Sequence, residues 1–378
     1  MKPKIIIVGS GLFGLTIAER IATILNLEVT IIEKRDHIGG NAWSEFDSTT
    51  GIEIHKYGSH LFHTSHEVVW KYVNQFTSFT DYQHRVWTKH DGEVFPLPIS
   101  LATISQFYGK SLNPQEARNL ISAEISAAGE VGTSNFESLA ISSIGKPLYE
   151  AFIKGYTQKQ WQLDPSLLPS EVFGRLPIRF NFNNRYFNDK YEGLPKDGYM
   201  KFLPQIINQK LIKVEIETDY FVNREKYDQA DLVVYTGAID KFFNYSHGLL
   251  GWRTLDFKVE TLEIDDFQGA SVMNYADLEF PFTRIHEFQH LHPERAKKSN
   301  GTVIMTEFSR TSGVDDEPYY PINSLRDRNA LADYRELASR ASNVIFGGRL
   351  GTYKYLDMHM AIASALQVFE TQIKPRYV

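Results

Sequence analysis

The sequence predicts an α/β fold that combines a parallel-sheet domain, a helical insert and a second sheet, antiparallel or mixed. Residues 5–8 form an apolar run, a glycine-rich loop and a helical pattern follow, and a second apolar run ends at residue 33. This order is a βαβ unit, the context in which a glycine-rich loop binds a dinucleotide. Residues from about 98 to 169 have helical spacing, whereas residues 257–308 carry short alternating aromatic and β-branched stretches, which predict strands.

The other elements follow in chain order. One helix is expected to begin at Asn113 and Pro114, with an acidic residue in its first turn, and another lies within residues 143–161. Strands are predicted within 172–191, 211–220 and 230–238, and the last stretch predicts a strand, a glycine loop and a closing helix. We therefore expect a discontinuous Rossmann-like domain over 1–80, 196–245 and 325–378, a helical substrate domain over 81–172, and a sheet domain over 173–195 and 246–324.

Composition limits the possible partners. The chain has 378 residues, a formal charge of −6 and no cysteine. The negative charge argues against a nucleic-acid partner, and the lack of cysteine excludes disulfides, thiolate nucleophiles and cysteine metal sites. Glycines interrupt the apolar start, so it does not fit a signal peptide, and no stretch approaches the roughly 20 apolar residues that span a bilayer. We expect a cytoplasmic protein without membrane insertion.

The loop after the first strand has the spacing of a dinucleotide-binding motif. Gly9 allows a tight turn, Gly11 lets the backbone approach a pyrophosphate, and Gly14 lets the helix pack on the strand. Glu33 ends the second strand, where a carboxylate binds a ribose hydroxyl. Strand, loop, helix, strand and acid agree, so we predict that this segment binds a dinucleotide.

The residues after Glu33 favour a flavin over a nicotinamide. Gly39, Gly40 and Asn41 follow the acid, and this second glycine pair resembles the extended signature of FAD proteins of the glutathione-reductase and amine-oxidase type. The stretch GGRLGTYKYLDM near residue 350 resembles their second flavin motif. The Rossmann-like domain is therefore expected to bind FAD. No second GxGxxG unit follows, so a separate NAD(P)H domain is not expected, and electrons would come from an external reductant, from the substrate, or not be turned over at all.

A helix and an arginine-rich stretch suggest a site for an anionic ligand. Phe152, Tyr156 and Gln160 share one helical face, with Trp161 nearby, and the alternative is an aromatic stripe in the core. Arginines 175, 179 and 185 precede Tyr186, and guanidinium groups pair bidentately with phosphate oxygens. Solvated surface charge is the alternative for these arginines. His55, His60 and His63 lack a carboxylate at ligand spacing, so no metal is expected.

Specific motifs occur along most of the chain, namely GIEIHKYGSHLFHT, GYTQKQW, GRLPIRFNFNNRYF, MNYAD, FTRIHEF, PYYP and GRLGTYKYLDM. Together they resemble the bacterial UDP-galactopyranose mutase family, and the resemblance runs nearly end to end. It departs at His84, where relatives often carry asparagine, so His84 is left out of the expected site.

The resemblance implies a role for residues throughout the chain. The catalytic candidates are Arg175, on a loop that closes over the ligand, Arg284, which reaches the diphosphate, and His63, beside the flavin ring. The substrate-binding candidates are Phe152, Tyr156, Thr157, Trp161, Tyr186, Asn274, Tyr320, Tyr355 and Asp357. The cofactor-binding candidates are Gly9, Gly11, Phe13, Gly14, Glu33, Lys34, Gly39, Gly40, Asn41, His60, Arg349, Tyr355, Asp357 and Met358.

The resemblance also implies a reaction and partners. The expected reaction interconverts UDP-galactopyranose and UDP-galactofuranose, with N5 of reduced FAD as nucleophile on the anomeric carbon, and feeds galactofuranose into cell-surface glycans. The substrate is a UDP-sugar, and a homodimer is expected because family members commonly form one. Two alternatives remain: a flavin oxidase of the amine-oxidase type, whose pocket would suit an amine, and a non-catalytic protein that binds FAD or a nucleotide sugar.

Overall fold

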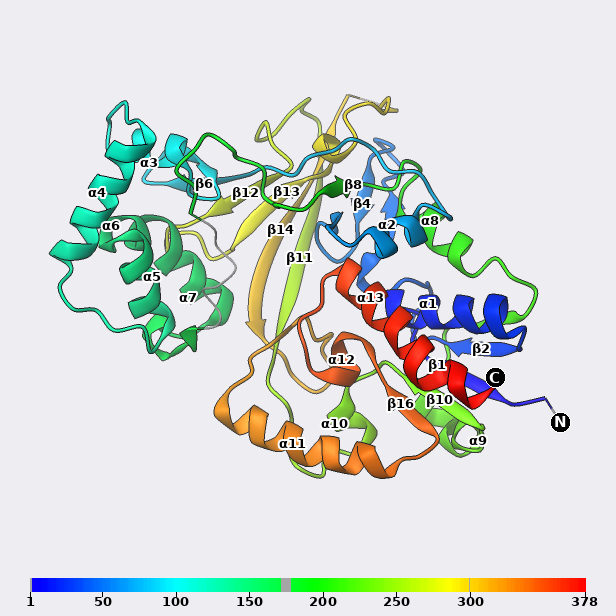
Figure 1. Cartoon of the computed structure of the whole chain (residues 1–378). Helices are drawn as coiled ribbons and strands as arrows, with labels where there is room; N and C mark the ends of the chain where they lie inside the picture. The colour runs from blue at the N-terminus through cyan, green and yellow to red at the C-terminus, as the bar shows by residue number, and fades with distance from the viewer. Residues whose placement is uncertain (1, 171–177, 299) are drawn as a thin grey trace.

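A five-stranded parallel sheet forms the part of the molecule that holds both chain ends (Figure 1). The computed structural model describes residues 2–170, 178–298 and 300–378. The strand order is β16 (Val344–Phe346), β10 (Leu232–Tyr235), β1 (Ile5–Val8), β2 (Val29–Ile32) and β9 (Ile212–Glu215). Four of these strands read as continuous apolar or nearly apolar runs, as expected for a sheet that is covered on both faces.

Each face of this sheet packs against its own layer. On one face α1 (Leu12–Arg20) lies beside α13 (Met358–Val368) and α8 (Tyr199–Ile206), and residues such as Ile7 and Val234 join their core. On the other face Val233 and Tyr235 pack on aromatic side chains that include Phe242. Four further helices are α9 (Arg224–Asp228), α10 (Ile239–Phe242), α11 (Leu325–Arg340) and α12 (Gly348–Thr352); α10 contacts α11 and α12, and α12 also contacts α1 and α13.

A seven-stranded mixed sheet stands beside the parallel one. Its strands are, in order, β15 (Tyr320–Pro321), β11 (Trp252–Leu262), β14 (Thr302–Thr311), β13 (Arg284–Glu287), β12 (Val272–Tyr275), β6 (Val86–His90) and β7 (Glu93–Leu97). All neighbours are antiparallel except the parallel pair of β12 and β6. The predicted α/β class, with a parallel sheet and a second sheet, is confirmed.

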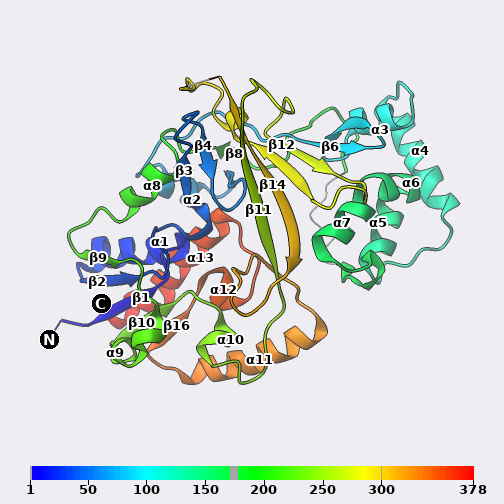
Figure 2. The same cartoon turned by 180° about the vertical axis from the view of Figure 1, so that it is seen from behind.

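A group of helices lies on the far side of the long strands β11 and β14 from the parallel sheet (Figures 1 and 2). The group comprises α3 (Leu101–Phe107), α4 (Pro114–Ala127), α5 (Phe136–Ile144), α6 (Lys146–Leu148), a π-helical stretch (Tyr149–Lys154) and α7 (Gly155–Trp161). The predicted start at Asn113 and Pro114 is confirmed. The Asn113 side chain accepts from the backbone N–H groups of Gln115 and Glu116, and the Glu116 carboxylate accepts from the backbone N–H of Asn113.

A β-hairpin lies within the range 81–172 that was assigned to the helical domain, just before the stretch predicted to be helical. Strands β6 and β7 are joined by Asp91 and Gly92, both with positive φ, which is the two-residue turn that matches strand twist. Asp91 and Gly92, within the stretch HDGE, were therefore a hairpin signal that the assignment of this range to a helical domain overlooked. The division of the chain into three predicted domains stays a prediction.

The strands expected over 172–191 are largely missing from the described part of that stretch. Residues 171–177 lie outside the described residues, and the next regular element is β8 (Tyr191–Gly193). Local side-chain hydrogen bonds replace the backbone bonds of a β-ladder here. The Asn181 side chain accepts from Asn183 N, and the Asn183 side chain accepts from Arg185 N. Such local bonds favour turns over strands.

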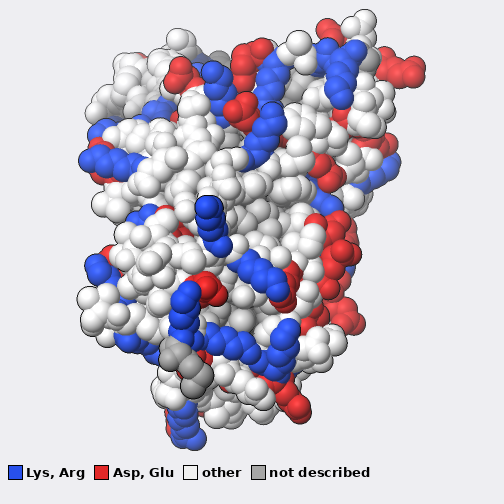
Figure 3. Space-filling view, turned by 90° about the vertical axis from the view of Figure 1, so that its right-hand side faces the viewer, with Lys and Arg blue, Asp and Glu red and all other residues white. Residues whose placement is uncertain are grey.

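Two short ribbons and one further helix complete the described elements. β3 (Ser44–Phe46) pairs with β4 (Glu53–His55), β5 (Phe62–Thr64) pairs with β8, and α2 (Glu67–Val73) follows β5. None of the helices in the described ranges has the length and apolar character needed to cross a membrane. On the face that holds the chain ends, basic and acidic side chains are interspersed (Figure 3).

Candidate functional site

Two adjoining cavities lie between the parallel sheet and the mixed sheet. The first, of about 420 Å³, opens at the carboxyl ends of β1 and β2 and contains the glycine loop. The second, of about 360 Å³, is bounded by the mixed sheet and by α7. Both are lined by His60, Arg349 and Met358, so the two cavities meet at these residues.

The glycine loop leaves open space at the N-terminus of α1. A Cβ added to Gly14 would lie 2.2 Å from the carbonyl oxygen of Gly9, so the helix packs too closely on the strand for any side chain there. A Cβ added to Gly11 would meet nothing within 4 Å, so the cavity continues up to the first backbone N–H groups of α1. These donors and the helix dipole favour an anionic group at that place.

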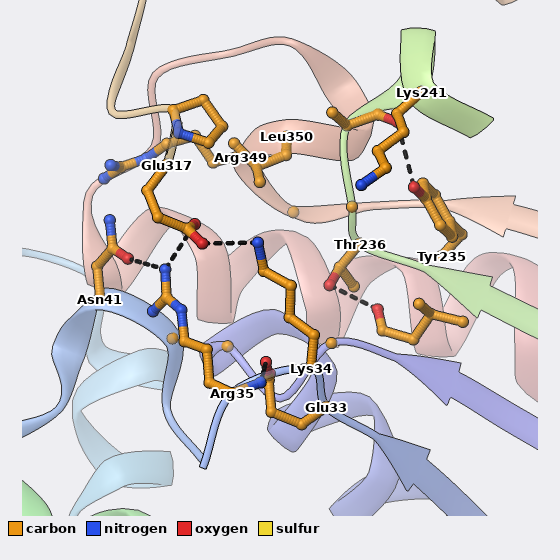
Figure 4. Close-up of a pocket in the computed structure, with 18 of the residues that line it drawn as sticks. Glu33, Lys34, Arg35, Asn41, Tyr235, Thr236, Lys241, Glu317, Arg349 and Leu350 are labelled. Atoms are coloured by element: carbon orange, nitrogen blue, oxygen red, sulfur yellow. Dashed lines mark hydrogen bonds and ion pairs between the residues drawn. The ribbon is translucent and has the colours of Figure 1, made fainter. Parts of the chain in front are cut away.

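Acidic and basic side chains enclose the mouth of the first cavity (Figure 4). Glu33, at the end of β2, accepts from Ser10 N at 2.9 Å and from Ser10 Oγ at 2.7 Å, so its carboxylate braces the glycine loop. Lys34 and Arg35 both pair with Glu317, at 2.6 Å and 2.8 Å. Arg35 also donates to Asn41 Oδ1, which ties the second glycine pair to the same group.

The sheet wall of the second cavity carries an arginine held on two sides. Arg284, on β13, donates from Nη2 to the hydroxyl of Tyr156 at 2.5 Å. Its Nε lies 3.0 Å from Oε1 of Glu307 on β14, although this N–H does not have hydrogen-bond geometry. Burial raises the pKa of Glu307, but the neighbouring Arg284 and His286 outweigh burial and lower it to about 2. The guanidinium is 27% exposed and lines the cavity.

Aromatic and polar side chains form the other walls of this cavity. Tyr320 and Tyr355 stack at 5.8 Å, and the guanidinium of Arg349 lies over the Tyr355 ring. The Oδ1 atom of Asn274 is buried without a hydrogen-bond partner among the described residues. The two cavities together offer a helix N-terminus, a paired arginine and several tyrosine hydroxyls, which suits two phosphate-bearing ligands that meet end to end.

Comparison with known proteins identifies the family. A family model described as UDP-galactopyranose mutase matches residues 151–355, and a model of NAD(P)-binding Rossmann-like domains matches residues 7–76. A probable UDP-galactopyranose mutase of Klebsiella pneumoniae is 45% identical over 364 residues, which cover 96% of this chain and 93% of that protein. The chain belongs to the UDP-galactopyranose mutase family.

Other relatives extend the comparison. A dTDP-fucopyranose mutase of Escherichia coli is 39% identical over 378 residues, covering 98% of each chain. The crystal structure of a reduced UDP-galactopyranose mutase superposes with a TM-score of 0.71, covers 99% of this chain and 94% of that chain, and is 15% identical, so it supports the fold alone. The UDP-galactopyranose mutase family therefore includes, among the relatives of this chain, enzymes named for two different nucleotide sugars.

Most candidates that the family resemblance suggested line one of the two cavities. The first cavity is lined by Gly9, Gly11, Phe13, Glu33, Lys34, Gly39, Gly40 and Asn41. The second is lined by Phe152, Tyr156, Thr157, Trp161, Tyr186, Asn274, Arg284, Tyr320, Tyr355, Asp357 and His63. Gly14 lies behind the loop, and Arg175 lies outside the described residues. The roles assigned to all of them stay predictions.

Two of the arginines considered for a diphosphate are engaged elsewhere. Arg179 is 7% exposed and donates to the carbonyls of Asn183 and Arg185 and to Asn188. Arg185 pairs with Glu192 at 2.8 Å. Both shape the loop that carries Tyr186, and neither lines one of the two cavities.

The three histidines considered for a metal do not converge as a ligand set. His55 is buried and accepts from the backbone N–H of His60, while His63 Nδ1 bonds to Asp189 at 2.7 Å and its ring stacks on Phe187 at 3.6 Å. A different trio, His63, Asp357 and His359, brings one possible ligand atom each to within 4.8 Å of the others. The expectation of no metal stays a prediction.

The structure adds cavity residues that sequence reasoning did not select. They are His84, Phe187, His286 and Glu307 in the second cavity, with Glu317 in the first. His84 is buried, and its Nδ1 lies 3.0 Å from the hydroxyl of Tyr82. Burial lowers the pKa of His84 to about 3, so the ring is neutral. Glu307 had a signal in the sequence, since it is the lone acid within the apolar run TVIMTEF.

Proposed function

We propose that the chain interconverts UDP-galactopyranose and UDP-galactofuranose, with reduced FAD in the first cavity and the nucleotide sugar in the second. The observation that carries this proposal is the junction of the two cavities at His60, Arg349 and Met358. A ligand in the second cavity can reach a cofactor ring there while its phosphates lie against Arg284. The 45% identity to a probable UDP-galactopyranose mutase supports the substrate class.

The residues of the first cavity fit FAD. The open space before Gly11 can hold a pyrophosphate against the backbone N–H groups of α1. Arg35 Nη1 is buried without a hydrogen-bond partner among the described residues, which leaves a donor for a bound group. Lys34, Asn41 and Glu317 would enclose one end of the cofactor, and His60 and Met358 would lie against the other.

The cofactor and the protein divide the chemistry. Reduced FAD, when bound, supplies N5 as a nucleophile for the anomeric carbon of the sugar. Arg284 and Tyr156 hold the diphosphate as it departs and keep it available for return, because a preorganised cation stabilises developing negative charge. Phe152, Tyr156 and Thr157 would hold the uridine, and Trp161 would line the sugar pocket. A nucleotide sugar that fills the second cavity would displace water, which would otherwise hydrolyse the sugar intermediate.

We also propose how the flavin is reduced, how and where the protein acts, and what its product is used for. The flavin receives its electrons from an external reductant, the protein acts as a homodimer in the cytoplasm, and its product supplies galactofuranose for cell-surface glycans. Arg175 is proposed as a second arginine that closes over the diphosphate.

The deciding experiment compares the two redox states of the flavin. Protein reduced with dithionite should convert UDP-galactofuranose to UDP-galactopyranose, whereas oxidised protein should show little turnover, measured by chromatography of the nucleotide sugars. Equal rates in both states would contradict the nucleophilic role of the flavin. Because a 39% identical relative is a dTDP-fucopyranose mutase, dTDP-fucopyranose belongs in a parallel assay, and faster turnover of it would reassign the substrate.

A further inference from the structure

A buried polar chain lies directly behind Arg284. Ser59 Oγ lies 2.8 Å from Nδ1 of His286, and Nε2 of His286 lies 3.3 Å from Oε2 of Glu307. The other carboxylate oxygen, Oε1, accepts from Thr283 Oγ at 2.9 Å and faces Arg284 Nε at 3.0 Å. Of these, only Arg284 has a role in the proposed function.

Strand pairing brings these side chains together. Arg284 and Glu307 are directly opposite each other in the β13–β14 ladder, so their side chains share one face of the mixed sheet. His286 follows Arg284 by two residues and therefore projects from that same face. The chain is thus built from adjacent strands, which are rigid supports for a binding group.

The carboxylate fixes the direction of each hydrogen bond. An ionised Glu307 can only accept, so His286 must donate from Nε2–H. In the neutral ring Nδ1 is then an acceptor, and Ser59 donates its hydroxyl hydrogen to it. His286 is 1% exposed and Glu307 is 2% exposed, so water does not replace either bond.

Glu307 has two opposite effects on an anionic ligand. With Tyr156 it holds the guanidinium of Arg284, which favours a phosphate in the cavity. Its own negative charge lies in the same wall and repels that phosphate. The donors on His286 and Thr283 offset this repulsion, because hydrogen bonds to an ionised carboxylate take up part of its charge.

We propose that His286 is a positioning residue for the nucleotide diphosphate, which it serves by donating Nε2–H to Glu307 behind Arg284. This inference rests on the proposed function, because the ligand is the diphosphate of the same nucleotide sugar. Without this donor a buried carboxylate oxygen is left unsatisfied, and Glu307 then draws Arg284 toward itself and repels the ligand more strongly.

The test measures binding of UDP and of uridine to the oxidised, FAD-loaded protein by titration calorimetry, with uridine in competition against UDP. His286→Leu should weaken UDP about tenfold, equivalent to about 1.4 kcal/mol, and leave uridine within twofold. His286→Gln keeps an amide donor of similar reach and should stay within threefold of the wild type for UDP. Arg284→Ala sets the reference for complete loss of the guanidinium.

His290→Leu is the matched control, because His290 follows the same strand and also pairs with a buried carboxylate, Glu287, but lines neither cavity. It should leave both affinities unchanged. The proposal is overturned if His286→Leu binds UDP within twofold of the wild type, or if uridine weakens as much as UDP. Should His286→Leu lose its flavin, His286→Asn, which is too short to reach Glu307, takes its place under the same criteria.

The two proposals fail in different ways. A wild-type protein that does not bind UDP contradicts the proposed function itself. A wild type that binds UDP, with weak binding in Arg284→Ala and normal binding in His286→Leu, contradicts only the role of His286.

Discussion

Single buried histidines make the stability of this protein sensitive to acid. Burial lowers the pKa of His55 and His84 to about 3 and that of His60 to about 4, so these rings are neutral in the folded chain. In the unfolded chain each titrates near pH 6.5. The unfolded state therefore binds more protons between about pH 4 and 6.5, and the free energy of unfolding falls as the pH falls through that window.

We expect the unfolding temperature to drop steadily from pH 7 to pH 5, since each such histidine contributes up to ~1.4 kcal/mol per pH unit. His290 opposes the trend, because the pKa of its ring is raised by Glu287. His84→Asn should show a shallower decline than the wild type, measured by calorimetry on the FAD-loaded protein. An identical slope in the two proteins would show that His84 is not held neutral.

Individual site residues could be chosen from the sequence only where a local motif carries them. The motif of Gly9, Gly11 and Gly14 can be recognised from its spacing alone, without information about distant segments. The contact of Arg284 with Tyr156 joins residues 128 positions apart, and that of Arg35 with Glu317 spans 282 positions. Neither pair leaves a local signal, so the role of Arg284 at the diphosphate came from the family resemblance, and nothing suggested Glu317.

At the scale of elements, one buried arginine attaches a cavity helix to the mixed sheet. Arg253 on β11 donates from Nε to the carbonyl of Gln160 near the end of α7, and from its two terminal nitrogens to Thr311 and Ser309 on β14. Burial lowers the pKa of this guanidinium to about 10. The arginine supplies donors for a helix-end carbonyl that has no intrahelical partner.

Arg253→Met should therefore lower the free energy of unfolding by about 1–3 kcal/mol, because it removes the buried hydrogen bonds that join α7 to β14 and leaves the carbonyl of Gln160 with the Ser309 hydroxyl alone. It should also weaken UDP binding, since Tyr156, Thr157 and Trp161 lie on α7. Arg253→Lys keeps the charge but not the fork of donors, so it should be intermediate. Urea unfolding and UDP titration would contradict this account if the lysine variant matched the wild type in both.

Elements were predictable where one pattern dominated the stretch. The βαβ unit and the start of α4 were found because apolar period and capping residues agree over many positions. The hairpin of β6 and β7 was missed because its two short strands lie next to a long helical stretch, although Asp91 and Gly92 mark the turn. Residues 178–190 have strand-forming aromatics, but their asparagines bond to the local backbone instead.

At the scale of the molecule, the segment that leaves the mixed sheet also covers the first cavity. Residues 312–318 follow β14 and line this cavity, and Glu317 joins them to Lys34 and Arg35 beside β2. The preceding residue, Asp316, pairs with Arg310 on β14 at 2.5 Å. Ion pairs on two adjacent residues therefore hold the covering segment to β14 on one side and to Lys34 and Arg35 on the other.

Glu317→Gln should speed the release of FAD by about two- to tenfold, because it weakens both ion pairs while keeping the size of the side chain. Asp315→Asn is the matched control, since Asp315 lines the same cavity and also loses one charge. Fluorescence of released flavin, followed after dilution at several salt concentrations, gives the rate. Equal release from the two variants would mean that Glu317 does not retain the cofactor.

The strand order of the parallel sheet also governs how the chain can fold during synthesis. β1 is the middle strand of this sheet. Its neighbour β10 is synthesised only after β6 and β7 of the mixed sheet, and the edge strand β16 is synthesised only after most of the chain. A nascent chain released before residue 346 exposes the apolar edge of β10, the kind of edge that pairs with other chains. Translation must therefore reach the last tenth of this protein before its cofactor domain can close, and until then the emerging chain exposes apolar surface that favours aggregation.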